Sequence, residues 1–147
     1  WLDLLCVAAR IAGIGMHVDY YNRDRHAEYL VHSGDLHGFS HRDIVLLGAT
    51  VRWAISGTPD LTPYNAILEP DDLRAVGVLT ALLGTAAAVR RRKPSPVLHF
   101  AAEATAHGLD LRIGGAASME AELVALGRQA RRLEAALRVP VKVSVTA

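Results

Sequence analysis

The sequence contains little cysteine, few aromatic residues and almost no net charge. Cys6 is the only cysteine, so no disulfide can form within the chain, and secretion has no support. Aromatic residues make up 5% of the chain and hydrophobic residues 51%, so the core must consist mainly of Leu, Val, Ile and Ala, which favours a helical protein. A net charge of +1 is too small to indicate a nucleic-acid-binding protein, and a charged fraction of 21% is that of a globular chain rather than a disordered one.

The sequence also lacks a membrane-spanning run and a leader. The longest uncharged run, residues 75–89, is shorter than the roughly 20 residues needed to cross a bilayer, so it predicts a buried helix. No basic leader or initiating Met precedes Trp1, and the first residues read as the middle of a helix. We therefore expect a segment of a longer, cytoplasmic protein with no membrane partner.

Hydrophobic periodicity predicts helices over the first two-thirds of the chain. Apolar residues recur at helical spacing in segments 1–12, 24–32, 40–55 and 70–92. In the first segment these residues are Leu2, Leu5, Ala9 and Ala12. Ser40 and Asp43 have the spacing of a capping box, and Pro70 is a typical first residue of a helix.

The pattern changes after Pro94 and Pro96. Segments 97–104 and 109–113 read as a hairpin with a turn at Gly108, Ser118 reads as the cap of a helix, and segment 141–145 alternates like a strand. The sequence thus predicts an α+β fold, mostly α, in which a helical region over 1–93 is followed by a small β-β-α-β lobe over 94–147.

No arrangement of residues indicates a catalytic or metal centre. His17, Asp19 and His26 are close in sequence, but their spacing fixes no coordination geometry. Cys6 lies among apolar residues in a predicted helix, where cysteine usually fills the core. We therefore expect no metal and no cofactor in this chain, and we assign no catalytic residue.

Two groups of basic residues are candidates for anion binding. Residues 18–26 contain Arg23 and Arg25 beside two tyrosines, and could present donors to an anion; alternatively this is a packed loop in which the tyrosines cover the helices and Asn22 caps the next helix. The run from Arg90 to Lys93 ends a predicted helix, where cations are favoured by the helix dipole even without a ligand. It is therefore either a binding patch or a solvated helix end.

Two motifs resemble a known family. Residues 11–30, IAGIGMHVDYYNRDRHAEYL, resemble the "LHDIG…YYNxHxHSAYLI" stretch of the exopolyphosphatase/guanosine pentaphosphate phosphatase (Ppx/GppA) family, and residues 36–42, LHGFSHR, resemble its "LPGFSHRE" turn. The β-β-α-β tail is also similar to the end of such proteins. The likeness covers almost the whole chain.

The resemblance implies the C-terminal, HD-like helical region of such a hydrolase. Catalysis in that family belongs to N-terminal lobes that have no counterpart here, so the chain alone should hydrolyse nothing. The region would help to bind polyphosphate or a related phosphate and would contribute to a homodimer, with no specific nucleic-acid partner. The candidate phosphate contacts are Arg23, Arg25, His26, Arg42, Arg90, Arg91, Arg92 and Lys93.

Departures from the family pattern leave two alternatives open. The His-Asp pair of relatives is replaced by Ala12 and Gly13, a histidine is lost within residues 52–55, and an aspartate is lost within 86–90, so that only His26 remains of the metal-type positions. One imidazole cannot hold a hydrolytic metal. The alternatives are a purely structural, dimerising module and a divergent metal-dependent phosphohydrolase that uses His17, Asp19 and His26.

Overall fold

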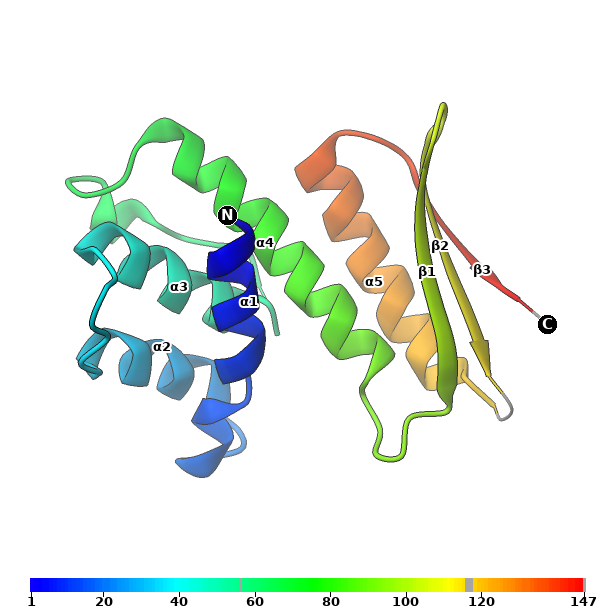
Figure 1. Ribbon diagram of the computed structural model, residues 1–147, viewed down its shortest axis with the longest axis horizontal. Helices are drawn as coiled ribbons and strands as arrows, with labels where there is room; N and C mark the ends of the chain where they lie inside the picture. Colours follow the sequence, from blue (N-terminus) through cyan, green and yellow to red (C-terminus); the bar gives the residue numbers. More distant parts are fainter. Residues whose placement is uncertain (56, 116–117, 147) are drawn as a thin grey trace. The chain divides into compact units, whose positions relative to one another are not determined.

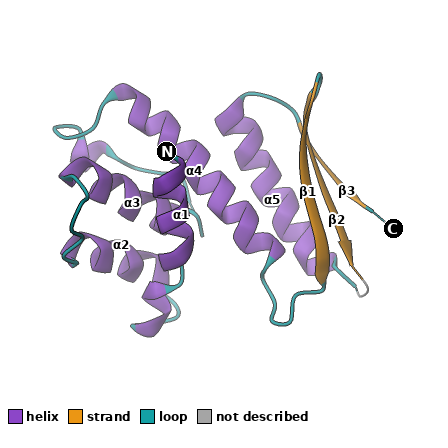
Figure 2. Cartoon of the chain, viewed as in Figure 1, coloured by secondary structure: helices purple, strands orange, loops and turns teal. Residues whose placement is uncertain are grey.

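The computed structural model describes residues 1–55, 57–115 and 118–146 and confirms an α+β fold that is mostly α (Figures 1 and 2). Its elements are α1 (Leu2–Ile11), η1 (Ile14–His17), α2 (Arg23–Ser33), α3 (His41–Trp53), η2 (Thr62–Tyr64), α4 (Pro70–Val89), β1 (Val97–Thr105), β2 (Gly108–Gly115), α5 (Glu120–Leu137) and β3 (Val141–Val145). The chain divides into two compact units, unit 1 over Trp1–Leu83 and unit 2 over Gly84–Ala147. The division falls inside α4, whereas the sequence placed a boundary after residue 93.

Unit 1 is a helical bundle with a single apolar core. Helix α3 packs against α1 and α2, and most of its length is buried. The residues of the core come from every long helix of the unit: Leu4, Ala8, Ala27, Val31, Leu46, Leu47, Ala49, Val51, Ala54, Leu61, Val76, Leu79 and Leu83.

The buried face of α1 differs from the predicted one. Leu4 and Ala8 are buried, whereas Leu2 is 72% exposed and Cys6 is exposed, so the expectation that Cys6 fills the core is wrong. Cys6 follows Leu4 by two residues, which is about 200° around a helix, so it lies on the opposite face. An apolar neighbourhood in sequence did not distinguish the two faces because both carry apolar residues.

The start of α3 is as the sequence predicts. Ser40 is the N-cap, its side chain accepts a hydrogen bond from the backbone N–H of Asp43, and the Asp43 carboxylate accepts one from the backbone N–H of Ser40. These reciprocal bonds satisfy two helix N–H groups that otherwise have no partner. The hydrogen bonds from Ser40 lower the pKa of Asp43.

Helix α4 is the longest helix of the described chain. By length and composition alone it could cross a membrane, and it is the one such helix among the described residues, but 56% of its most apolar window is buried inside the protein. That burial is typical of a core helix, as the run of residues 75–89 predicted.

Unit 2 is a three-stranded sheet with one helix. Strands β1 and β2 form an antiparallel hairpin, β3 pairs in parallel with β2, and α5 connects them (Figure 2), which confirms the predicted β-β-α-β order. Leu111 and Ile113 of β2 are buried, as are Leu126, Ala130 and Leu133 of α5.

The predicted cap of α5 is wrong. The N-cap is Met119, without a side-chain hydrogen bond, and the helix begins at Glu120. Arg92 donates to the backbone carbonyl of Ser118 and to the carboxylate of Glu122. A distant arginine therefore engages both sides of this helix start, and Ser118 lies one residue outside the cap position.

Candidate functional site

The loop before α2 is organised by Asp19. Its carboxylate accepts hydrogen bonds from the backbone N–H of Tyr21 (3.2 Å) and from Nδ2 of Asn22 (3.0 Å). These bonds lower the pKa of Asp19, and nearby His26 contributes in the same direction. Asn22 occupies the N-cap position of α2, but its side chain turns to Asp19 and caps nothing, contrary to the packed-loop interpretation. The adjacent Tyr21 is 88% exposed, so it does not cover a helix.

Three predicted phosphate contacts lie in the first turn of α2. Arg23 is half-buried; its guanidinium lies 4.6 Å from the centre of the Tyr20 ring and donates to the Tyr20 carbonyl at 3.2 Å. Arg25 is exposed and His26 is half-buried. In the described part of the chain neither arginine has a carboxylate within ion-pair distance. A helix start with uncapped N–H groups and two arginines is favourable for an anion.

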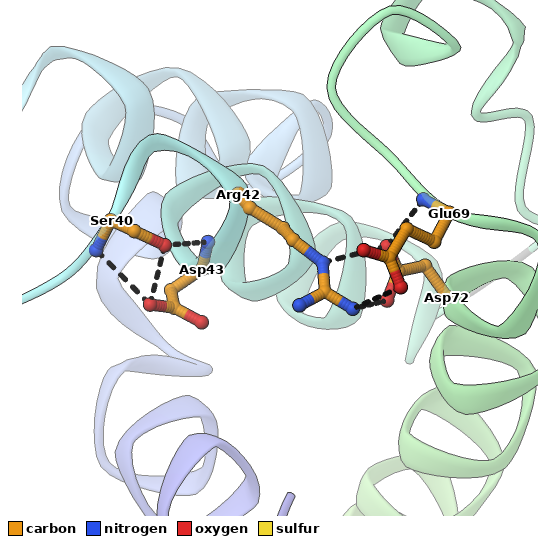
Figure 3. A network of polar contacts seen from close by, with 5 residues as sticks. All are labelled: Ser40, Arg42, Asp43, Glu69 and Asp72. Atoms are coloured by element: carbon orange, nitrogen blue, oxygen red, sulfur yellow. Dashed lines mark hydrogen bonds and ion pairs between the residues drawn. The ribbon is translucent and has the colours of Figure 1, made fainter.

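Arg42 has a different environment (Figure 3). From the first turn of α3 it makes two parallel hydrogen bonds with Asp72, Nε to Oδ2 at 2.9 Å and Nη2 to Oδ1 at 2.7 Å, and it lies 3.6 Å from Glu69. Asp72 is fully buried and also accepts the backbone N–H of Glu69 at 2.8 Å. The Arg42 hydrogen bond holds the pKa of Asp72 below its ordinary value. The contact joins α3 to the start of α4.

The run from Arg90 to Lys93 follows the last turn of α4, and all four residues are exposed. Arg92 makes two 2.7 Å hydrogen bonds with Glu122, whose side chain is 1% exposed, and a 2.8 Å bond to the Ser118 carbonyl. The Arg92 hydrogen bond lowers the pKa of Glu122. Within the described residues Arg90, Arg91 and Lys93 have no such carboxylate partner.

One of these three cations lines a hollow of unit 2. Arg91, with Arg128 from α5, borders an open depression of about 400 Å³ whose other walls include Glu120 and Val124. Arg128 was not among the predicted contacts. The sequence could have indicated Arg128, because it follows Val124 by four residues and lies off the apolar stripe of the helix. Residues with this spacing lie on the same face of a helix.

Comparison with known families matches residues 1–125 to Ppx/GppA phosphatase, domain III. The match covers most of the chain and includes both motifs singled out above. The chain belongs to the Ppx/GppA phosphatase family. It corresponds to an accessory domain of that family, one of several domains in such proteins. No curated protein matches the chain.

This Ppx/GppA domain does not bring together a metal-binding set in its described residues. No three His, Cys, Asp or Glu side chains converge there. Asp19, the carboxylate of the metal-dependent alternative, is already engaged by Tyr21 and Asn22. The structure therefore gives His17, Asp19 and His26 no support as a hydrolytic centre.

The segment at the end of α3 has a structural role. Arg52, at the end of α3, forms an ion pair with Glu28 of α2 and stacks 4.4 Å from the centre of the Trp53 ring. Both charged side chains are largely covered, with 27% of Arg52 and 13% of Glu28 exposed. The partner, Glu28, was not predicted, because nothing in the sequence connects two residues 24 positions apart.

Proposed function

We propose that this chain is an accessory domain, without catalytic activity of its own, that binds polyphosphate or a related phosphate and contributes to dimerisation beside the catalytic lobes of its parent protein. The observation that carries the proposal is the division of the predicted cations into two kinds. Arg42 and Arg92 each bind a buried carboxylate. Their contact with phosphate stays a prediction. Arg23, Arg25, Arg90, Arg91 and Lys93 have no carboxylate partner among the described residues.

Arginines without a carboxylate partner favour a polyanionic ligand. Arginine donates two parallel hydrogen bonds to phosphate oxygens, and a chain of phosphates can engage several such cations in turn. Each unit carries its own set, Arg23 with Arg25 in unit 1 and Arg90 with Arg91 in unit 2. Neither set has to give up an existing ion pair to bind a ligand, whereas Arg42 and Arg92 would leave a buried carboxylate without its partner.

The test is a titration of the purified chain with polyphosphate of defined length. We expect binding at about 50 mM salt that weakens strongly at about 300 mM, because neutralising phosphates releases counterions. R23A/R25A and R90A/R91A should each lower the affinity about tenfold, a loss of about 1.4 kcal/mol. R10A/R131A is the matched control: it removes the same charge from two exposed arginines outside both sets and should change affinity less than about twofold.

Several results would contradict this assignment. Absence of binding at the lower salt, or an equal loss in the R10A/R131A control, would show that the arginines form no site. Competition by guanosine phosphates would not contradict the assignment; it would show that guanosine phosphates are the related phosphate that the chain binds. Release of inorganic phosphate by the purified chain would contradict the absence of catalysis.

A second candidate function is a structural module that dimerises and binds no ligand. It is favoured by one observation, the exposed edge strand β1 of unit 2, in which every residue after Val97 is exposed. Sedimentation of the chain with and without polyphosphate separates the two candidates, because a dimer that does not bind polyphosphate would support this one.

A further inference from the structure

Strand β1 has the features of an edge that another strand covers. In the described sheet the order is β1-β2-β3, so β1 pairs on one side only (Figure 1). It is nine residues long, all but Val97 exposed, with Leu98 65% and Phe100 43% exposed. An edge strand leaves alternate backbone N–H and C=O groups unpaired, and soluble proteins usually protect such an edge with lysine, proline or a short length.

The opposite edge of the same sheet is protected in this way. Strand β3 has only five residues and carries Lys142, whereas β1 contains no lysine, arginine or proline. Its one irregularity is a shift of register between Val97 and His99, and the ladder to β2 is regular from His99 to Thr105. The exposed and regular part of β1 is therefore a surface on which an added strand could pair.

The sequence of β1 is complementary to itself. When two copies of a strand pair antiparallel about a two-fold axis perpendicular to the sheet, residues that lie opposite each other point to the same face. One residue of the strand must therefore lie opposite its own copy, beside the axis. If that residue is Ala101, then His99 lies opposite Glu103 of the second copy and Phe100 lies opposite Ala102. We propose that β1 pairs antiparallel with β1 of a second copy of this chain, centred on Ala101, to form a continuous six-stranded sheet. The inference rests on the dimerisation proposed above and names its surface.

The proposed pairing places apolar side chains on one face of the sheet and polar side chains on the other. On one face Phe100, opposite Ile113 in the β2 ladder, extends the apolar surface of the buried β2 residues, and a large residue meets a small one across the new pair. On the other face lie His99, Glu103, Asp110 and Arg112, with Lys142 opposite Asp110. Glu103 forms an ion pair with Arg112, and His99 lies opposite Gly114 in the β2 ladder.

Side-chain pairing favours this register. Centring on Glu103 would place two carboxylates opposite each other, which is unfavourable. Centring on Ala101 is the only register that places each His99 opposite a Glu103. Cross-strand pairs of this kind act over about 5 Å between Cβ atoms.

Disulfide trapping tests the register directly. In a background with Cys6→Ser, which removes the one native thiol, A101C should form an intermolecular disulfide, since opposite Cα atoms in an antiparallel pair lie about 5 Å apart, within disulfide range. A104C is the matched control, also an exposed alanine of β1, and its two copies would lie about 20 Å apart. We expect A101C to cross-link at least about tenfold faster on non-reducing gels.

Charge exchange gives a second, independent test. H99E places two carboxylates opposite each other, and E103H removes the carboxylate that lies opposite His99, so each variant alone should dimerise less than the native chain in sedimentation experiments. Mixed in equal amounts they restore two complementary pairs and should form a heterodimer. K142E, at the other edge, should leave dimerisation unchanged.

The outcomes separate this inference from the proposed function. A native chain that sediments as a monomer at about 0.1 mM would overturn both the pairing and the proposed dimerisation, and would leave the edge to a strand from elsewhere. A dimer in which A101C cross-links no faster than A104C would overturn the β1 pairing alone. A mixture of H99E and E103H no more dimeric than its components would do the same.

Discussion

In each unit an arginine binds a buried carboxylate at the start of a helix, but the two units differ in how their backbone hydrogen bonds are satisfied. In unit 1 Arg42 binds Asp72, and in unit 2 Arg92 binds Glu122; each carboxylate is buried, is the third residue of its helix and lies 30 residues after its arginine. Unit 1 is built of helices, whose backbone hydrogen bonds lie mostly within each helix, whereas unit 2 leaves the β1 edge unpaired in the described sheet. Arg42 and Arg92 therefore hold helix starts in place, and unit 2 also presents a strand edge without a partner in the described sheet.

Acidification should have the largest effect, because it acts on both units at once. The pKa values of Asp72, Glu122 and Asp43 are lowered by their hydrogen bonds, so the folded chain binds fewer protons than the unfolded one. The stability from these groups is complete above the unfolded pKa of about 4 and is lost as pH falls through the lower folded values. Circular dichroism between about pH 5 and 2 should show loss of structure in both units, and salt-insensitive retention of the fold at about pH 2 would contradict this shared role of the carboxylates.

Removal of one of the two buried carboxylates should destabilise only the unit that contains it. D72N leaves Arg42 without its buried partner and should destabilise unit 1 by about 3 kcal/mol in urea unfolding. Both tryptophans, Trp1 and Trp53, belong to unit 1, so their fluorescence reports this unit alone. D71N, the exposed neighbour, is the matched control and should change little. E122Q should instead weaken amide-exchange protection in unit 2 and leave tryptophan unfolding unchanged; the reverse pattern would refute the assignment of each contact to its unit.

Glycine substitutions probe unit 2 with opposite signs. Gly108 has φ +146°, and a Cβ there would lie 2.2 Å from the Pro140 carbonyl oxygen, which accepts the N–H of Leu109. G108A should therefore destabilise the sheet by about 2 kcal/mol, as seen by amide exchange in β1 and β2. Gly127 in α5 has open space around it, so G127A should stabilise by up to about 1 kcal/mol. Equal effects of both changes would mean that the hairpin turn is not constrained as described.

The helix caps give the smallest expected difference between the units. S40A removes one side of the capping box of α3 and should cost about 1 kcal/mol in urea unfolding. S118A should stay within about 0.5 kcal/mol, because α5 has no side-chain cap. A larger cost for S118A than for S40A would restore the cap that the sequence suggested.

The sequence predicted what depends on near neighbours. The capping box of Ser40 and Asp43 and the hairpin turn at Gly108 involve residues within three positions of one another, so their pattern is visible in a single chain. The order of helices and strands followed from hydrophobic period for the same reason. The buried face of α1 was missed because apolar residues occur on both of its sides.

The partners of the arginines could not be predicted. Arg42 and Arg92 looked like Arg23 and Arg91 in the sequence, and only the fold shows that two of the four already hold buried carboxylates. The contact of Arg92 with the Ser118 carbonyl could not be predicted either, because the two residues are 26 positions apart. Pairing across such distances depends on how the chain is folded and leaves no local pattern.

The parallel pairing of β2 with β3 has a consequence for the order in which the chain acquires structure. The β1–β2 hairpin joins neighbouring segments and can form within microseconds, but β3 can join β2 only after all of α5 has crossed back. Non-local pairings of this kind are slow to form. During synthesis, therefore, the helices of unit 1 can pack together before Val141–Val145 has been made. Until that strand pairs with β2, the β1–β2 hairpin has two free edges that are exposed to neighbouring chains.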